Sequence, residues 1–440
     1  MTKLTIQWPD ADAERVEAAK GRLDVARRRL VARSREGILA VLGSVFDQWR
    51  QPESKWRRRF MDEFPERSGF SAEVARAGIE LALESWTGEA LAQAVEGELR
   101  PAPGATPHAL SPFSMTSVIL GGAIPMPNLL GSVLPLCAQS PVLIKPASRD
   151  PVTPALLAEA IAEADPELGR CIEVVRFPSS DGESLGRFLA AECVVATGSN
   201  ETIRQIRARV RTSQRFVAYG HKLSVAVINA EGWKRRDPRP VVEALALDIA
   251  LWDQLGCLSP LALYLVGPEA ARETPAFAGA LAEALEALQQ SLPRGETPLE
   301  AASAIRHERD EARIRAAAGG GVSLFESPGT EWTVVGESNA EWRPSPLHRF
   351  VRVHPVPRID ELGEALRPIV RNLSSVALAG FAPGAGAGAQ EEVGRVLARL
   401  GATRLCEAGR MQAPALDWHH DGQPILLPLV RFTGMEIASD

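Results

Sequence analysis

The chain has 440 residues, of which 45% are hydrophobic, so it is long enough for two or three domains with substantial apolar cores. Its 49 basic residues are outnumbered by 55 acidic residues, and the net charge of -6 argues against nucleic acid as a primary partner. The five cysteines form no CxxC pair and have no histidine at ligand spacing, which argues against a metal site and a disulfide framework. This cysteine usage predicts a protein of the reducing cytoplasm.

The first 110 residues are predicted to be mostly helical. Residues 14–48 form an amphipathic helical pattern, and acidic side chains such as Glu14 are unlike a transit peptide. Residues 104–144 then contain no Asp, Glu, Lys or Arg, but prolines such as Pro125 and Pro135 exclude a membrane-spanning helix. We expect this uncharged stretch to form buried strands and short helices.

From residue 116 onward, strand-like and helix-like segments alternate. The strand-like segments are residues 116–120, 142–145, 172–177, 193–196, 215–218 and 224–228. Helical patterns separate most of them, at residues 129–138, 154–164, 184–191 and 200–210. Strands separated by such helices predict right-handed crossovers and a doubly wound parallel sheet. Ligands of these sheets bind at the carboxyl ends of the strands.

One strand of this sheet runs directly into Thr197, Gly198 and Ser199, after which a helix begins. Ser199 can cap the helix, Gly198 lets a pyrophosphate approach, and the free N–H groups favour an anion. The pattern alone is weak, because every crossover helix needs a cap. No GxGxxG follows the first strand, where Gly121 and Gly122 stand instead, so the usual dinucleotide fingerprint is absent.

A second block of alternating elements extends from residue 230 to about residue 424, and Cys257 is its most informative residue. Cys257 lies between a helical pattern over residues 241–252 and a strand-like run over residues 261–266. Gly256 permits close approach of the backbone to a substrate, and Pro260 ends any helix. The thiol is therefore a candidate nucleophile for thioester chemistry. The alternative is a small buried side chain, which from this segment alone is the more frequent case.

Four elements resemble, in order and in spacing, the landmark motifs of the aldehyde dehydrogenase superfamily. They are residues 144–148, 196–199, 220–222 and 254–257. The particular forms of residues 253–260, 418–422 and 429–432 are similar to the bioluminescence-type fatty acyl-CoA reductases, the LuxC family. The resemblance covers the chain from Phe113 onward and implies an α/β fold of the aldehyde dehydrogenase type. That fold joins a Rossmann-type parallel-sheet cofactor domain to an α/β catalytic domain.

The resemblance also divides the chain into regions. We expect a helical amino-terminal region over residues 1–110, an NADPH-binding Rossmann-like domain over residues 111–229 and a catalytic α/β domain over residues 230–424 that carries Cys257. Residues 425–440 are expected to return to the cofactor domain or to an oligomer interface.

For the cofactor, the resemblance implies that Lys145 contacts ribose hydroxyls and that residues 197–199 bind phosphate; a solvated lysine at a strand end is the alternative for Lys145. Ser148 stands where the superfamily holds the adenosine ribose with a glutamate, and Arg149 follows it. Exchanging a carboxylate for a neighbouring cation favours a 2′-phosphate and therefore NADPH.

For catalysis, the resemblance implies that Cys257 is the nucleophile. Hydrolytic aldehyde dehydrogenases activate water with a glutamate at the position of Ala218, so an acyl-Cys257 thioester is expected to react slowly with water. Asn128 is the nearest asparagine to the position of the superfamily's oxyanion donor, but it could equally cap the helix that follows. His420 could orient or protonate the reacting group together with Asp421, or both residues could form a structural turn.

The implied reaction is the NADPH-dependent reduction of a fatty acyl thioester, carried by coenzyme A or another thiol carrier, to an aldehyde through an acyl-Cys257 intermediate. A partner protein that transfers the acyl group and a homo-oligomeric state are implied as well. Two alternatives remain: an aldehyde dehydrogenase working in the oxidative direction, which Ala218 disfavours, and a non-reducing acyl-transfer or scaffold subunit.

Overall fold

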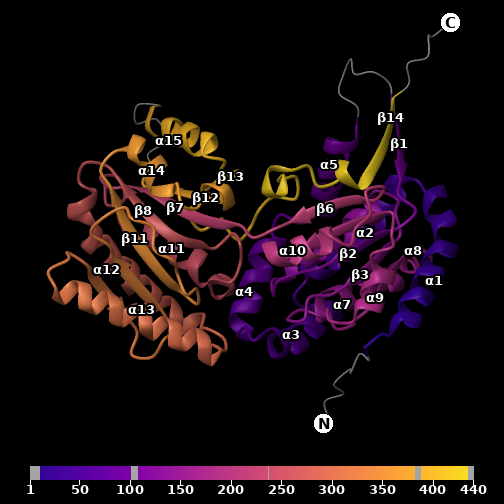
Figure 1. Ribbon diagram of the computed structural model, residues 1–440, viewed down its shortest axis with the longest axis horizontal. Coiled ribbons are helices and arrows are strands. Elements are labelled where there is room, and N and C mark those ends of the chain that lie inside the picture. The colour runs from indigo at the N-terminus through magenta and orange to yellow at the C-terminus, as the bar shows by residue number, and fades with distance from the viewer. Residues whose placement is uncertain (1–9, 101–107, 236, 382–387, 435–440) are drawn as a thin grey trace, which may run out of the picture. The chain divides into compact units, whose positions relative to one another are not determined.

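The computed structural model describes residues 10–100, 108–235, 237–381 and 388–434 (Figure 1). The chain divides into two compact units. The first comprises residues 1–68, 83–220 and 415–440, and the second comprises residues 69–82 and 221–414. Parts of the predicted amino-terminal region and carboxyl-terminal segment, at residues 1–9, 101–107 and 435–440, lie outside the described residues. Each unit is built around a sheet of its own.

The first unit contains a five-stranded parallel sheet with the strand order β4-β3-β2-β5-β6. Its strands are β2 (Thr116–Ile119), β3 (Val142–Lys145), β4 (Ile172–Val174), β5 (Cys193–Thr197) and β6 (Arg215–Tyr219). The direction of winding reverses between β2 and β5, which is where doubly wound sheets bind their ligands. The carboxyl ends of these two strands therefore mark the expected cofactor edge.

Helices cover both faces of this sheet (Figure 1). Ile119 belongs to the apolar cluster that packs beneath α1 and α9, whereas Val118 and Leu120 point to α6, as the two-residue period of a strand requires. The helices of the unit are α1 (Ala13–Ala32), α2 (Arg35–Arg50), α3 (Lys55–Ser68), α5 (Gly88–Leu99), α6 (Pro125–Cys137), α7 (Val152–Ala164), α8 (Pro166–Gly169), α9 (Gly182–Phe188) and α10 (Asn200–Arg207).

The carboxyl-terminal part of the chain is built into the first unit. Strand β14 (Val430–Gly434) pairs antiparallel with β1 (His108–Pro112), and the two lie side by side in Figure 1. The carboxylate of Glu98 on α5 accepts backbone hydrogen bonds at 2.7–3.0 Å from Ile425, Leu426 and Leu427. The short helices η4 (His420–Gly422) and η5 (Leu427–Leu429) belong to the same segment. These contacts hold residues 420–434 on the first unit.

The second unit contains a seven-stranded sheet with the order β13-β12-β7-β8-β11-β10-β9, in which only β9 is antiparallel to its neighbour. Its strands are β7 (Leu223–Asn229), β8 (Pro260–Val266), β9 (Ser323–Glu326), β10 (Thr333–Gly336), β11 (Phe350–Val356), β12 (Leu373–Ala379) and β13 (Arg404–Glu407). Every residue of β8 and β11 is buried, as expected for central strands covered on both faces.

Alternate residues of β7 enter two separate cores. Ala226 and Ile228 pack beneath α11 and α12, whereas Val225 and Val227 pack beneath α14 and α15. The helical elements of this unit are α4 (Ala72–Leu83), α11 (Arg239–Ala250), η1 (Leu251–Gln254), α12 (Ala270–Ser291), α13 (Leu299–Ala317), η2 (Ile359–Glu361), α14 (Leu362–Leu366), η3 (Val370–Asn372) and α15 (Gly388–Arg399).

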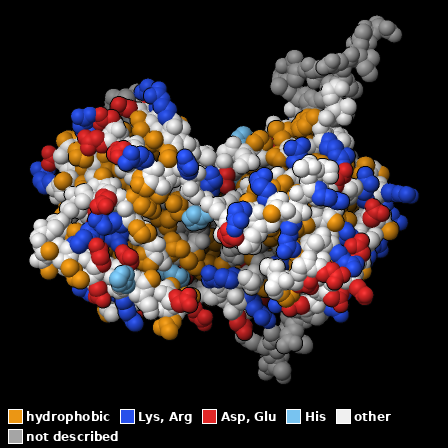
Figure 2. All heavy atoms as spheres, viewed as in Figure 1, with side chains coloured by type: hydrophobic (Ala, Val, Ile, Leu, Met, Phe, Trp, Pro, Cys, Tyr) orange, Lys and Arg blue, Asp and Glu red, His pale blue; other side chains and the backbone are white. Residues whose placement is uncertain are grey.

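The visible surface mixes acidic and basic side chains without one dominant sign (Figure 2). Among the described residues, no helix combines the length and the apolar character needed to span a membrane.

Candidate active site

Cys257 lies on a tight turn between η1 and β8, and its side chain is exposed. The N–H of Ser259 donates to the carbonyl of Gly256 at 3.0 Å, which closes the turn around the cysteine. The Ser224 hydroxyl at the start of β7 donates to the carbonyl of Cys257 at 2.6 Å. The backbone that carries the thiol is thus fixed from both sides while its sulfur is accessible.

The other four cysteines are poorly suited to nucleophilic chemistry. Cys137 and Cys193 are buried, and desolvation raises the pKa of each thiol to about 12. Burial likewise raises the pKa of Cys171 and of Cys406 to about 11. A thiolate is the reactive form, so Cys257 is the strongest candidate of the five.

Three consecutive residues just before this turn adopt a left-handed conformation. Trp252, Asp253 and Gln254 have φ values of 55°, 51° and 62°. For residues other than glycine this conformation costs about 1–2 kcal/mol each, so it persists only where surrounding contacts enforce it. The helix expected over residues 241–252 accordingly ends at Ala250, because the chain reverses its handedness there.

A buried ion pair holds this left-handed segment. The guanidinium of Arg349 contacts Oδ1 of Asp253 at 2.7 Å through Nη2 and at 3.1 Å through Nε, and both side chains are almost fully buried. The Asp253 Oδ2 atom accepts the N–H of Gly295 at 3.0 Å. Gln254 donates through Nε2 to the carbonyl of Pro260 at 2.9 Å, which bridges the segment across the cysteine turn.

Arg349 itself lies in a second left-handed segment. Leu347, His348 and Arg349 have φ values of 66°, 56° and 66°. The ion pair therefore joins two backbone segments that are each held in an unfavourable conformation. Sequence reasoning missed Arg349, because it is 96 positions from Asp253 and no local pattern marks it.

The expected cofactor residues gather at the carboxyl edge of the five-stranded sheet. Lys145 ends β3 and Thr197 ends β5. Ser199 caps α10 by accepting the N–H of Thr202 at 3.1 Å. Gly121, in the loop after β2, approaches Thr197 so closely that a Cβ atom would lie 2.4 Å from the Thr197 carbonyl oxygen. The glycine is thus required for close packing of the two strand ends.

Among the described residues, no carboxylate contacts the ammonium group of Lys145. Its ammonium lies 5.2 Å from the centroid of the Phe177 ring, and burial lowers the pKa of Lys145. Ser148 is exposed. The guanidinium of Arg149 donates to the carbonyl of Ser68 through Nη2 at 2.6 Å and Nε at 3.2 Å. The assignment of these residues to a cofactor stays a prediction.

Asn128 is buried on α6, where its Nδ2 atom donates to the carboxylate of Asp150 at 2.6 Å. Asp150 also accepts the N–H of Thr153 at 2.9 Å, which fixes the start of α7. Desolvation raises the pKa of Asp150 to about 6. The contact shows where the Asn128 amide points in this structure, and a role for Asn128 as an oxyanion donor remains an expectation.

His420 belongs to an aromatic cluster that the sequence did not reveal. Its ring stacks on Tyr219, the last residue of β6, with a centroid distance of 4.5 Å, and Trp418 packs at 5.1 Å. The Nε2 atom of His420 is 3.8 Å from the Asp421 carboxylate. Burial raises the pKa of Tyr219, so its hydroxyl remains protonated at neutral pH. Tyr219 and His420 line a small cavity of about 40 Å³ whose other walls are mostly apolar.

Ala218 directly precedes Tyr219 on β6, at the position of the water-activating glutamate of hydrolytic aldehyde dehydrogenases. Its methyl group has no acid–base chemistry. Within the first unit, the structure brings Ala218 to the same carboxyl edge as Thr197, since the two strands pair with Ala196 opposite Ala218.

Comparison with known proteins settles the family. A sequence profile of the family described as acyl-CoA reductase (LuxC) matches residues 30–432. The chain belongs to this LuxC family. Its relatives include the long-chain acyl-protein thioester reductase of Aliivibrio fischeri, which is 23% identical over 417 residues, covering 91% of this chain and 82% of the relative. The protein of the same name from Photorhabdus luminescens is 25% identical over 420 residues, with the same coverage.

Solved structures with a similar fold include aldehyde dehydrogenases. A NAD-dependent benzaldehyde dehydrogenase from Corynebacterium glutamicum has a TM-score of 0.71 at 17% identity, covering 97% of this chain and 91% of that chain. An NADP-dependent enzyme from E. coli also has a TM-score of 0.71, at 15% identity and with 97% and 90% covered. At these identities the likeness concerns the fold. It confirms the aldehyde dehydrogenase-like fold, and the profile match confirms the LuxC family predicted from the sequence motifs.

Proposed function

We propose that this chain reduces a fatty acyl thioester to an aldehyde, with NADPH as the hydride donor and Cys257 as the nucleophile. The observation that carries the proposal is the exposed Cys257 thiol on a doubly anchored turn, in a chain that belongs to the acyl-CoA reductase (LuxC) family. The names of the relatives, which describe acyl-protein thioester reductases, support a thioester substrate.

In the first step, the Cys257 thiolate attacks the carbonyl carbon of the acyl thioester. The C–S bond to the carrier breaks, the carrier leaves as a thiolate, and the acyl group is held on Cys257 as a new thioester. The backbone N–H of Cys257 is the proposed donor to the oxyanion of this step, because the anchored turn limits its reorientation. A fixed donor of this kind needs little reorganisation as charge develops.

The residues of the sheet edge fit a dinucleotide. Lys145 is available for ribose hydroxyls, and the capped start of α10 offers backbone N–H groups to a pyrophosphate. Gly198 lacks a side chain that could obstruct such a ligand, whereas Gly121 lets the end of β2 pack against Thr197. When bound, NADPH supplies the hydride that reduces the Cys257 thioester. Collapse of the resulting thiohemiacetal on Cys257 releases the aldehyde and regenerates the thiolate.

Ala218 supports reduction over hydrolysis. Without a carboxylate at this position, the chain lacks the base by which related enzymes direct water at the acyl group. The acyl group on Cys257 would then survive until hydride or a thiol reaches it. The oxyanion re-forms a carbonyl as the Cys257 thiolate leaves, so the collapse itself consumes no proton. His420, whose ring stacks on Tyr219, is the proposed residue that orients or transiently protonates the thiohemiacetal oxygen.

The acyl donor is proposed to be coenzyme A or a carrier protein, and the relatives' names favour a protein-bound acyl group. We also propose that the chain receives its acyl group from a partner protein, forms a homo-oligomer and works in the cytoplasm. An acyl group delivered by a protein would explain why the nucleophile lies on an exposed turn.

Intact-mass spectrometry after mixing the chain with a long-chain acyl-CoA tests the nucleophile. The wild type should gain one acyl mass and form aldehyde once NADPH is added, because Cys257 carries the acyl group. Cys257→Ala should lose both properties while its circular dichroism spectrum and NADPH binding are unchanged. Cys406→Ala, which removes a half-buried thiol, is the matched control and should behave as the wild type. Acyl labelling and turnover that persist in Cys257→Ala would disprove the assignment.

A further inference from the structure

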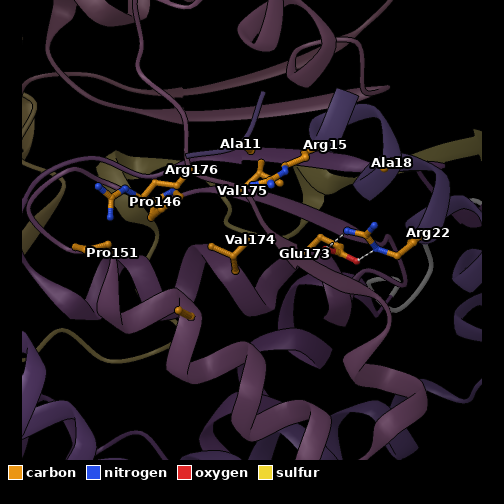
Figure 3. Close-up of a pocket in the computed structure, with 11 residues that line it drawn as sticks. Ala11, Arg15, Ala18, Arg22, Pro146, Pro151, Glu173, Val174, Val175 and Arg176 are labelled. Atoms are coloured by element: carbon orange, nitrogen blue, oxygen red, sulfur yellow. Dashed lines mark hydrogen bonds and ion pairs between the residues drawn. The ribbon is translucent and has the colours of Figure 1, made fainter. Parts of the chain in front are cut away.

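A pocket of about 350 Å³ opens at the carboxyl ends of β3 and β4 in the first unit (Figure 3). Its walls come from α1 and the residues before it, from the start of α7 with the preceding proline, from β4 and from the residues that follow β3 and β4. They are Ala11, Arg15, Ala18, Arg22, Pro146, Pro151, Ala155, Glu173, Val174, Val175 and Arg176. The volume is in the range of small-molecule sites and is too large for a single ion.

The pocket has an excess of positive charge. Three arginines and one glutamate line it, and the arginines differ in whether a carboxylate contacts their guanidinium group. Arg22 forms a two-pronged contact with Glu173, at 2.6 and 2.9 Å, and Nε of Arg176 is 3.4 Å from Asp10. Figure 3 shows the Arg22–Glu173 pair at one side of the pocket and Arg15 extending from α1 toward Val175. Across the parts of the chain that the structure describes, the Arg15 guanidinium forms no hydrogen bond or ion pair.

The pocket adjoins the segment that the superfamily motif assigns to the adenosine ribose. Pro146 on its wall directly follows Lys145, whose ammonium faces the Phe177 ring and contacts no carboxylate among the described residues. The Arg149 guanidinium is engaged by the Ser68 carbonyl. A cation for a ribose phosphate is therefore more readily supplied by Arg15, from a helix that the family motifs do not include.

We propose that this pocket receives the 2′-phosphate of the adenosine end of NADPH and that Arg15 is the residue that selects it. The inference rests on the proposed use of a nicotinamide dinucleotide at this sheet edge. A phosphomonoester carries up to two negative charges, and a guanidinium donates two parallel hydrogen bonds to it. Arg15 is exposed and has only to reorient, whereas Arg22 would first have to leave Glu173.

Calorimetric titration with adenosine 2′,5′-bisphosphate, adenosine 5′-monophosphate and adenosine 3′,5′-bisphosphate at one fixed salt concentration tests the proposal. The wild type should bind the 2′,5′ compound at least about tenfold more tightly than the monophosphate, as one charge-assisted hydrogen bond implies. Arg15→Ala should remove that preference and leave monophosphate binding unchanged. Arg28→Ala, which deletes an exposed arginine of the same helix outside the pocket, is the matched control and should bind as the wild type.

A wild-type preference that Arg15→Ala leaves intact would overturn the assignment of Arg15, and NADPH could still be the cofactor. Tighter binding of the 3′,5′ isomer would overturn it as well, because coenzyme A carries its ribose phosphate at that position. If the wild type binds none of the three and also fails to bind NADPH, the cofactor part of the proposed function fails. Acylation of Cys257, measured by mass, does not depend on this pocket. It therefore distinguishes a failure of the pocket assignment from a failure of the proposed function.

Discussion

At the scale of single residues, cofactor choice depends on the balance of charge around one ribose. Ser148 lies exposed where related enzymes hold the ribose diol with a carboxylate. A carboxylate there would repel a 2′-phosphate, whereas a serine hydroxyl accepts or donates one hydrogen bond without charge. In the proposed cofactor site the serine would permit NADPH, and a cation such as Arg15 would favour it over NADH.

Ser148→Glu should narrow or reverse the preference for NADPH over NADH. The expected change is roughly 1–3 kcal/mol in the ratio of kcat/KM for the two nucleotides, the scale of a charge-assisted hydrogen bond. Ser213→Glu, in the turn that enters β6 at the opposite edge of the sheet, adds the same charge and should leave the ratio unchanged. A preference that Ser148→Glu does not alter would show that the end of β3 does not contact the ribose.

At the scale of elements, the turn that carries Cys257 is held by contacts from distant parts of the second unit. The left-handed residues before it are costly by themselves, and the Asp253–Arg349 pair offsets that cost. Removing one partner of a buried ion pair typically costs about 3–5 kcal/mol, since a buried charge is left uncompensated. We therefore infer that Arg349 positions the turn that carries Cys257, because it holds Asp253 in place.

Arg349→Lys should slow the acylation of Cys257, because a lysine keeps the charge but cannot make the two-pronged contact with Asp253. NADPH affinity should be unchanged, since the cofactor residues belong to the other unit. The matched control is Arg309→Lys, which alters another buried arginine of the same unit that contacts Thr333 and Trp332. Both variants should lower the urea midpoint, but only Arg349→Lys should lower the acylation rate. Equal rates in the two variants would contradict the positioning role.

The sequence predicted the strands of the parallel sheets well where a short apolar run is flanked by turn or loop residues. The strand expected over residues 142–145 has these bounds in the structure, and the strand expected over residues 193–196 gains only Thr197. The helix expected from residue 129 begins already at Pro125, because proline is well tolerated in a first helical turn. Local patterns suffice for these elements.

The remaining features depend on contacts between distant segments, which no local pattern encodes. The stacking of His420 on Tyr219 joins residues about 200 positions apart, and the Asp253–Arg349 pair joins two separate loops. Cys257 could be proposed as the nucleophile from sequence because its glycine and proline neighbours and the family motif mark it. The residues that support it, such as Ser224 and Arg349, could not be found in that way.

At the scale of the whole molecule, the proposed reaction draws on both units. The proposed cofactor residues Lys145 and Ser199 belong to the first unit, together with Ala218 and His420, and the proposed nucleophile Cys257 belongs to the second. In the proposed reaction, the acyl group must remain on the thiol of the second unit until a hydride arrives. The thioester on Cys257 must therefore resist water and yield to reduction.

A single-turnover chase of the acylated chain measures both properties of this thioester. Protein labelled with a long-chain acyl-CoA is separated from excess reagent, and the acyl mass is followed in buffer, with coenzyme A and with NADPH. We expect slow loss in buffer because Ala218 cannot activate water, faster return to acyl-CoA with coenzyme A, and aldehyde formation with NADPH. Ala218→Glu, which restores a base at that position, should accelerate hydrolysis. Rapid release of free fatty acid from the wild type in buffer alone would contradict the account.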